Sequence, residues 1–163
     1  MLYPKMLREE ARLRNKGFTL IAGIDEAGRG PLAGPVVAAC CILKGLPFTT
    51  EVNDSKLLSP KKRETAYREI ILKTFFSIGI VRSDLIDKIN IYNATKLAME
   101  KAVKNLSLVP DYLLIDGNIS LPNISIPQKP LIKGDSRSLS IASASIIAKV
   151  TRDRIMAYYH EYF

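Results

Sequence analysis

Apolar runs alternate with charged, helix-like segments along the chain. Residues 18–24 and 36–43 are rich in apolar and β-branched residues and predict two strands. We expect the first strand to end at Asp25 and Glu26. Glycine and proline residues in the following stretch indicate a turn, so we expect the two strands to pair antiparallel. A third apolar run, at 75–81, predicts another strand.

Helix signals fill the segments between the strands. Ser59 is a favourable N-cap and Pro60 suits the first helical position, which predicts a helix from there to about residue 73. Ser83 can cap a short helix, and the apolar stripe of 93–105 predicts another. Further helices are expected at about 5–15 and from residue 138 or 140 onward, the last one rich in small residues that favour close packing on a sheet.

Two later apolar runs complete the predicted sheet. Residues 112–115 end at Asp116, and 130–132 end near Asp135. Consecutive strands followed by strands that alternate with helices predict an α/β fold, with a mixed sheet and helices on its faces. The chain has 163 residues, without an internal repeat or a linker, so we expect one domain over 1–163.

Charge and composition narrow the possible functions. The chain contains 24 Lys and Arg residues against 16 Asp and Glu, a net charge of +8. This balance is typical of a protein that binds a polyanion such as nucleic acid, although a generic basic protein is the alternative. His160 is the only histidine, which disfavours mechanisms that need a Ser-His or Cys-His pair and zinc sites rich in histidine. An enzyme with this composition must use carboxylates.

The two cysteines indicate a reducing compartment. Cys40 and Cys41 are adjacent within an apolar run, which disfavours both a structural disulfide and a zinc site. We expect them to be buried free thiols. The sequence shows no signal-peptide pattern and no long uncharged apolar stretch. We therefore expect a cytoplasmic protein without membrane association.

Acidic residues recur where the predicted strands end: Asp25, Glu26, Asp116 and Asp135. Clustered carboxylates suit Mg²⁺, which prefers oxygen ligands, and paired divalent ions assist phosphodiester hydrolysis. Neighbours on a regular strand point to opposite faces, so Asp25 and Glu26 share a site only where the strand ends or bulges. Each acid alone is more typical of a solvated strand end, a turn or a helix start. Their shared position favours a metal site.

The string AGRGPLAG after the first acidic pair is unusual for a structural loop. Gly28 and Gly30 allow the backbone to approach a ligand closely, and Arg29 between them cannot be buried cheaply. Backbone amides in such a turn can meet a phosphate or a sugar hydroxyl. An ordinary glycine turn with an exposed arginine is the alternative. Ser55 and Lys56, in the string NDSK, add donors suited to phosphate contacts.

Four strings together closely resemble the motifs of bacterial ribonuclease HII: GIDEAGRGPLAGPVVAA, NDSKLLSPKKRE, LLIDGN and KGDSRSLSIASASIIAKVTRDR. They occur in the family's order, from about residue 21 to residue 154. The resemblance implies a ribonuclease H-like fold, with a mixed five-stranded sheet flanked by helices. It also implies endonucleolytic cleavage of the RNA strand of RNA–DNA hybrids, and of single ribonucleotides in duplex DNA. The products would have 5′-phosphate and 3′-hydroxyl ends, and Mg²⁺ or Mn²⁺ would be the cofactor.

The resemblance further implies roles for individual residues. The family's metal-site carboxylates are matched by Asp25, Glu26, Asp116 and Asp135. The loop that contacts the ribonucleotide 2′-hydroxyl is matched by Gly28, Arg29 and Gly30. Contacts to the substrate backbone are implied for Ser55, Lys56 and Lys149. We expect a monomer.

The match has one departure, at the C-terminal end. Family members continue into a KGYG-like string whose tyrosine stacks at the cleavage junction, whereas this sequence ends at Phe163. We expect the chain to lack that tail, with reduced junction specificity and an intact metal site. About 20 residues precede the first motif, which favours this type over ribonuclease HIII with its additional N-terminal domain.

Two alternatives stay open beside the metal-dependent ribonuclease. One is a form that binds nucleic acid but is poorly active. The presence of all four carboxylates disfavours it. The other is a different nuclease of the same fold, such as a junction resolvase, which the glycine-arginine-glycine loop disfavours.

Overall fold

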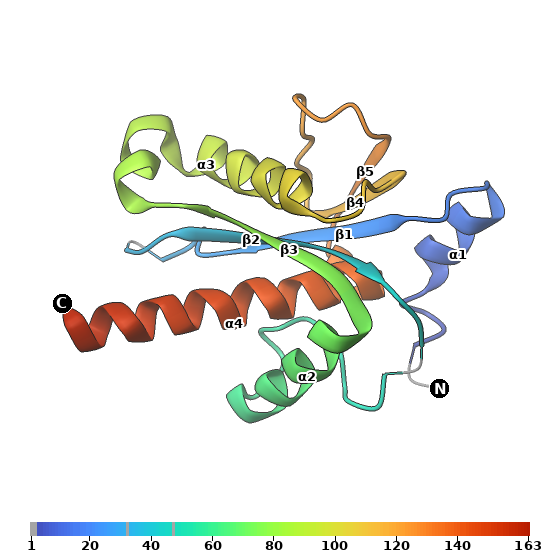
Figure 1. Ribbon diagram of the computed structural model, residues 1–163, viewed down its shortest axis with the longest axis horizontal. Coiled ribbons are helices and arrows are strands. Elements are labelled where there is room, and N and C mark those ends of the chain that lie inside the picture. The colour runs from blue at the N-terminus through green and yellow to red at the C-terminus, as the bar shows by residue number, and fades with distance from the viewer. Residues whose placement is uncertain (1–2, 32, 47) are drawn as a thin grey trace.

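The computed structural model describes residues 3–31, 33–46 and 48–163 (Figure 1). In chain order its elements are α1 (Arg8–Asn15), β1 (Ile21–Ala27), β2 (Val36–Leu43), α2 (Pro60–Lys73), β3 (Thr74–Val81), α3 (Ser83–Asn105), β4 (Tyr112–Asp116), β5 (Gln128–Leu131), the 3₁₀ turn η1 (Gly134–Ser136) and α4 (Leu139–Tyr162). No helix in the described part of the chain is both long and apolar enough to cross a membrane.

The five strands form one mixed sheet in the order β3-β2-β1-β4-β5. β2 pairs antiparallel with both β1 and β3, whereas β4 pairs parallel with both β1 and β5. The predicted mixed sheet and the antiparallel pairing of the first two strands are confirmed. Because β1 and β4 are parallel neighbours, their carboxyl ends meet at one edge of the sheet.

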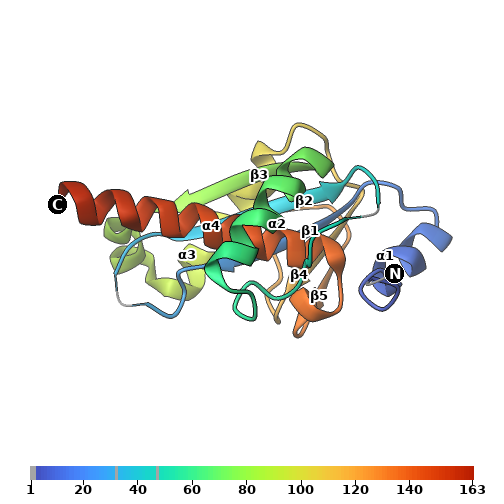
Figure 2. The same cartoon turned by 90° about the horizontal axis from the view of Figure 1, so that it is seen from below.

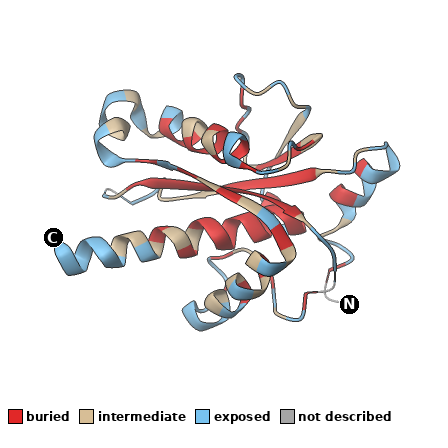
Figure 3. Cartoon of the chain, viewed as in Figure 1, coloured by how far each residue is buried: buried red, intermediate tan, exposed pale blue. Residues whose placement is uncertain are grey.

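Helices cover both faces of this sheet. α3 lies on one face, and α2 and α4 lie on the other (Figures 1 and 2). Side chains alternate along β2, so Cys40 packs into the core beneath α3 and Cys41 into the core beneath α4. Both thiols are free and buried, as predicted, and burial raises the pKa of Cys40 to about 12. Figure 3 shows the buried residues concentrated in the central strands and the helix faces against them.

A buried carboxylate joins α1 to the beginning of α4. One oxygen of Glu10 accepts hydrogen bonds from the hydroxyls of Ser138 and Ser140, at 2.6 and 2.8 Å, and from the Ser140 N–H at 3.0 Å. Ser138 is the N-cap of α4 and accepts the N–H of Ile141 at 3.2 Å. A negative charge at a helix N-terminus interacts favourably with the helix dipole. α1 therefore helps to fix the end of α4 that follows η1.

The first strand begins later than predicted, at Ile21 rather than residue 18. The residues before it bind a side chain instead of a neighbouring strand. The backbone N–H groups of Thr19 and Leu20 donate to the carboxylate of Asp111, at 2.8 and 3.0 Å. The strand propensity of residues 18–20 was therefore outweighed by hydrogen bonds to Asp111, which lies more than ninety residues later in the sequence.

The prediction that the first strand ends at its acidic pair is wrong. β1 continues through Asp25 and Glu26 to Ala27. The reason is that β2 keeps pairing with β1 past both acids in a regular register. On the other side, the parallel pairing with β4 ends at Ile24. The acidic pair therefore lies within a strand, one edge of which is no longer paired.

The remaining predicted elements are largely confirmed, with one adjustment to a helix and one to a strand. α3 joins the two predicted helices across a kink at Asn90, which has φ 67° and ψ 165°. The Asn90 side chain accepts the Asn93 N–H at 3.0 Å and so caps the second part. β5 lies at Gln128–Leu131 rather than 130–132. His160 is exposed on α4, in agreement with a solvent role.

Gly23 sets the closest approach between β1 and α4. A Cβ added there would lie 2.1 Å from the carbonyl carbon of Ser140 and 2.3 Å from the backbone nitrogen of Ile141. No flexible side chain can move to relieve such a contact, because both atoms belong to the backbone. The small residues at the start of α4 thus lie directly against the central strand.

We predict that Gly23→Ala lowers the free energy of unfolding by about 3 kcal/mol, because it separates β1 from α4. Gly45→Ala is the control, since a Cβ at Gly45 meets nothing within 4 Å, and it should change stability by less than about 0.5 kcal/mol. Urea unfolding of both variants measures the difference. Equal stabilities of the two variants would contradict the close packing.

Candidate metal centre and substrate cleft

Three carboxylates from separate elements meet at the carboxyl edge of β1 and β4. Asp25 lies in β1, Asp116 is the last residue of β4, and Asp135 lies in η1. One oxygen from each lies within 4.8 Å of the other two. Carboxylate oxygens are the ligands that Mg²⁺ and Mn²⁺ prefer. The structure thus brings three of the four predicted carboxylates into one group.

Backbone groups of η1 orient Asp116. Its Oδ1 accepts hydrogen bonds from the N–H groups of Gly134 at 2.7 Å and Asp135 at 3.4 Å. Lys133 turns the chain into η1 with a left-handed φ of 53°. Gly134 packs closely here, because an added Cβ would lie 2.6 Å from Cδ1 of Ile141 and 3.1 Å from Oδ1 of Asp116. The KGD string therefore supplies one carboxylate and fixes the position of another.

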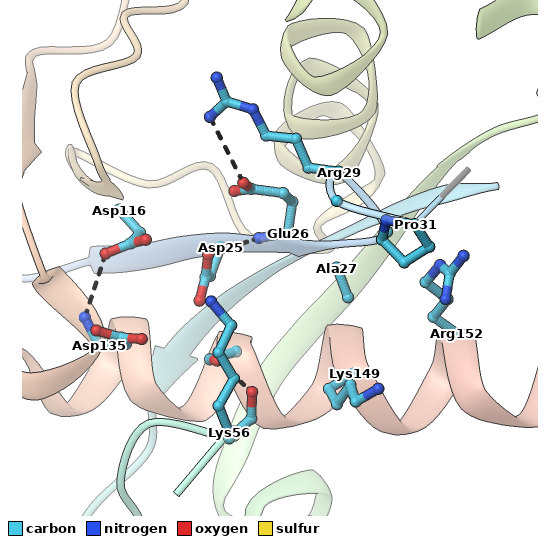
Figure 4. Close-up of a pocket in the computed structure, with 14 residues that line it drawn as sticks. Asp25, Glu26, Ala27, Arg29, Pro31, Lys56, Asp116, Asp135, Lys149 and Arg152 are labelled. Carbon is cyan, nitrogen blue, oxygen red and sulfur yellow. Dashed lines mark hydrogen bonds and ion pairs between the residues drawn. The ribbon is translucent and has the colours of Figure 1, made fainter. Parts of the chain in front are cut away.

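Glu26 lines the same cleft but lies outside the group of three. Figure 4 shows Asp25 and Glu26 leaving β1 in opposite directions, as a regular strand requires. The Glu26 side chain points towards Arg29, and the two charged groups are 4.0 Å apart. The Glu26 N–H donates to Oδ1 of Asp25 at 2.7 Å, which helps to orient that carboxylate.

Burial and mutual repulsion act on these acids together. Desolvation, followed by the charges of Glu26 and Asp116, raises the pKa of Asp25 well above its usual range. Desolvation and then Asp116 also raise the pKa of Glu26. For Asp135, desolvation and the charges of Asp116 and Asp54 raise the pKa to about 6. A divalent cation would offset this repulsion, so the donor set fits a metal ion.

Arg152 on α4 holds the glycine-rich loop in place. Its guanidinium donates to the carbonyl oxygens of Pro35 at 3.0 Å and Ala33 at 2.7 Å. Gly28, with φ +98°, packs so closely that an added Cβ would lie 2.4 Å from Nε of Arg152, whereas Gly30 faces open space. Sequence reasoning missed Arg152. An arginine on the buried side of a helix is the available signal, because its charge requires nearby acceptors.

The segment around Lys56 forms another part of the cleft. The Asp54 side chain accepts the Lys56 N–H at 2.9 Å in a tight turn, and Lys56 extends towards Asp25 (Figure 4). Ser55 is buried, and its hydroxyl accepts a hydrogen bond from Ser145 on α4 at 2.9 Å. Lys56 is therefore the accessible side chain of this predicted phosphate-binding segment, and Ser55 fastens the segment to α4.

A single cleft of about 320 Å³ unites the predicted residues (Figure 4). On α4, Nζ of Lys149 forms an ion pair with Asp153 at 2.7 Å. All ten predicted site residues line the cleft, together with Ser145 and Arg152: Asp25, Glu26, Gly28, Arg29, Gly30, Ser55, Lys56, Asp116, Asp135 and Lys149.

Solved structures share this architecture. The ribonuclease H2 of Pyrococcus horikoshii OT3 has 26% sequence identity and a TM-score of 0.74, over 88% of this chain and 77% of that chain. A structure described as the PCNA:RNase HII complex from Archaeoglobus fulgidus has 27% identity and a TM-score of 0.72, over 89% and 78%. The fold and the carboxylate site together define a ribonuclease H-like protein, as the resemblance implied.

The chain belongs to the Ribonuclease HII family, whose sequence model matches residues 22–162. Ribonuclease HII of Geotalea uraniireducens (strain Rf4) is 55% identical over 98% of this chain and 74% of the relative. That of Bacillus thuringiensis (strain Al Hakam) is 57% identical over 93% and 59%. That of Enterococcus faecalis (strain ATCC 700802 / V583) is 53% identical over 99% and 63%. The chain thus spans 59% to 74% of the length of these relatives.

We predict that Asp135→Asn stabilises the metal-free protein above pH 6. The raised pKa of Asp135, about 6, means that the folded state retains a proton that the unfolded chain releases near pH 4. The wild type therefore loses stability as the pH rises from about 4 to about 6, and the loss persists above that range. After allowance for solvent screening, the variant should be about 1 kcal/mol more stable at pH 7.5.

Urea unfolding in chelator at pH 4.5 and pH 7.5 measures this difference. Added Mn²⁺ should stabilise the wild type more than the variant, because the variant lacks one ligand. Asp87→Asn, on an exposed part of α3, controls for a general loss of negative charge. A variant that is less stable than the wild type at pH 7.5 in chelator would disprove the repulsion.

Proposed function

We propose that this chain is a metal-dependent endoribonuclease. It would cut the RNA strand of RNA–DNA hybrids and single ribonucleotides in duplex DNA, and leave 5′-phosphate and 3′-hydroxyl ends. The main observation in support is the group of three carboxylates inside a cleft that also holds cationic side chains. Membership of the Ribonuclease HII family supports the same activity. The alternative of nucleic-acid binding with poor cleavage gains no support from the comparisons.

Asp25, Asp116 and Asp135 would hold Mg²⁺ or Mn²⁺, with Glu26 as the fourth carboxylate of the cleft. Such ions, when bound, activate water and stabilise the leaving oxygen in phosphodiester hydrolysis. The protein's own contribution is to keep the ligands oriented. Asp25 is oriented by the Glu26 N–H, and this hydrogen bond also favours its ionised form.

Arg29, between Gly28 and Gly30, would recognise the 2′-hydroxyl of the ribonucleotide. The loop lies beside the carboxylates, and its backbone is fixed by Arg152. Gly30 faces open space, so a sugar can approach the backbone there. The ion pair with Glu26 holds the Arg29 guanidinium beside the residue that follows Asp25 in β1. This arrangement would couple recognition of a ribose to the position of its phosphate.

Lys56 and Lys149 would bind phosphates of the substrate backbone. They lie on separate elements that both line the cleft, so they can contact separate phosphates. Lys149 already has a partner in Asp153, which a phosphate would have to replace or share. The net charge of +8 favours association with a polyanion. Ser55 would act by holding the Lys56 segment against α4.

The proposal also covers the cellular compartment, the domain organisation and the oligomeric state of the protein. The buried free thiols of Cys40 and Cys41 suit a reducing compartment such as the cytoplasm. We expect residues 1–163 to act as one catalytic domain and as a monomer. All described strands belong to a single sheet, which agrees with one domain.

The test is cleavage of a hybrid and of duplex DNA that contains one ribonucleotide, with Mg²⁺, with Mn²⁺ and with chelator. We expect cleavage only with metal, and a loss of at least about 100-fold in Asp25→Asn, since it removes a direct metal ligand. Asp87→Asn matches the chemical change at an exposed site and should remain active. Cleavage in chelator, or full activity of Asp25→Asn, would refute the mechanism.

A further inference from the structure

A second pocket lies close to the carboxylate site, between the start of α1 and η1. It measures about 390 Å³ and is lined by Lys5, Arg8, Glu9, Ser136 and Arg137. Three of these five side chains are cationic and one offers a hydroxyl. Lys5 and Arg8 precede residues 22–162, the part of the chain that the family model matches.

Among the described residues that line this pocket, the one carboxylate, Glu9, is already neutralised. Nζ of Lys129 lies 2.9 Å from Glu9, with Arg137 at 3.5 Å and Arg12 at 3.7 Å. The hydrogen bond from Lys129 lowers the pKa of Glu9, so the carboxylate is ionised and surrounded by three cations. Its side chain is only 7% exposed, whereas that of Arg137 is 50% exposed. The exposed surface of the pocket is therefore positive.

Two further cations complete this positive surface. Lys5 and Arg8 are exposed, and neither has an ion pair or a side-chain hydrogen bond within the described part of the chain. A lysine or arginine that lines a hollow without an acidic partner is available to an anionic ligand. The pocket thus combines a neutralised Glu9 with two cationic side chains, Lys5 and Arg8, that are available to bind an anion.

The position of the pocket indicates which anion it fits. Arg137 is two residues beyond Asp135, so their Cα atoms lie within about 7 Å of each other. A duplex presents a phosphate about every 3.4 Å of axis on each strand, so this separation corresponds to about two base pairs from a phosphate held at the carboxylates. A nucleic-acid backbone that continues from the carboxylates past Arg137 would reach the pocket that Lys5 and Arg8 also line.

We infer that the pocket between α1 and η1 is an additional phosphate-binding subsite for the RNA–DNA duplex, in which Lys5 and Arg8 contact the backbone outside the cleavage site. This inference rests on the proposed function for the identity of the duplex. It assigns these residues to binding and not to chemistry, because they lie outside the carboxylate cleft. Their contacts would be independent of sequence, as phosphate contacts are.

The test measures binding of a labelled RNA–DNA hybrid in chelator, where cleavage does not interfere. The double variant Lys5→Ala/Arg8→Ala should weaken binding about tenfold and lower the slope of log K against log salt by about 1 to 2, since two phosphate contacts are lost. Lys5→Arg/Arg8→Lys keeps both charges and should bind like the wild type. Thermal melts should show that all variants are folded.

A charge-matched control separates the subsite from general attraction. Arg14→Ala/Lys16→Ala removes two exposed cations at the other end of α1, outside the pocket, and should change affinity less than twofold. Shortening the hybrid on the side of the cleavage site that reaches the pocket should weaken binding to the wild type but not to Lys5→Ala/Arg8→Ala. Equal weakening by both alanine pairs, or no weakening by either, would overturn the subsite.

Cleavage by the wild type distinguishes this inference from the proposed function. A wild type that binds hybrid through Lys5 and Arg8 but does not cut it would refute the proposed function and support the subsite. A wild type that cuts the hybrid while the Lys5→Ala/Arg8→Ala variant binds normally would refute only the subsite. Failure of the wild type to bind any hybrid would refute both.

Discussion

Repulsion among partly buried carboxylates is the constraint on which the rest of this structure depends. Asp25, Asp116 and Asp135 lie within 4.8 Å of one another at the edge of the sheet. The fold brings only a few donors to them, chiefly the backbone N–H groups of Glu26 and Gly134. The remaining charge must be balanced by cations. The site is therefore preorganised to bind cations, while the basic surface around it suits a polyanionic substrate.

The elements that sequence predicted well are those with local causes. Ser59 caps α2 as expected, because its hydroxyl accepts the N–H of Lys62 three residues later. The strands follow from apolar runs, and the candidate acids follow from their position after those runs. The end of β1 was not predictable in this way. The strand continues through Asp25 because β2 provides partners from a different part of the chain.

Features of the site that depend on distant contacts were also beyond sequence reasoning. Nothing in the spacing of Asp25 and Glu26 shows that one joins the group of three and the other faces Arg29. Arg152 supports the glycine-rich loop from α4, more than one hundred residues away. The motifs therefore identified which residues form the site. Only the tertiary structure showed which of them bind one another and which hold the backbone.

The link between Glu10 and α4 has a consequence for synthesis of the protein on the ribosome. Glu10 is made well before its partners Ser138 and Ser140, which lie 128 and 130 residues later. One face of β1 is likewise covered only when α4 packs against it. During translation the face of the central strands that α4 covers remains exposed until α4 has emerged, and exposed strands are prone to aggregation. The metal centre can thus assemble only after Asp135 has been made.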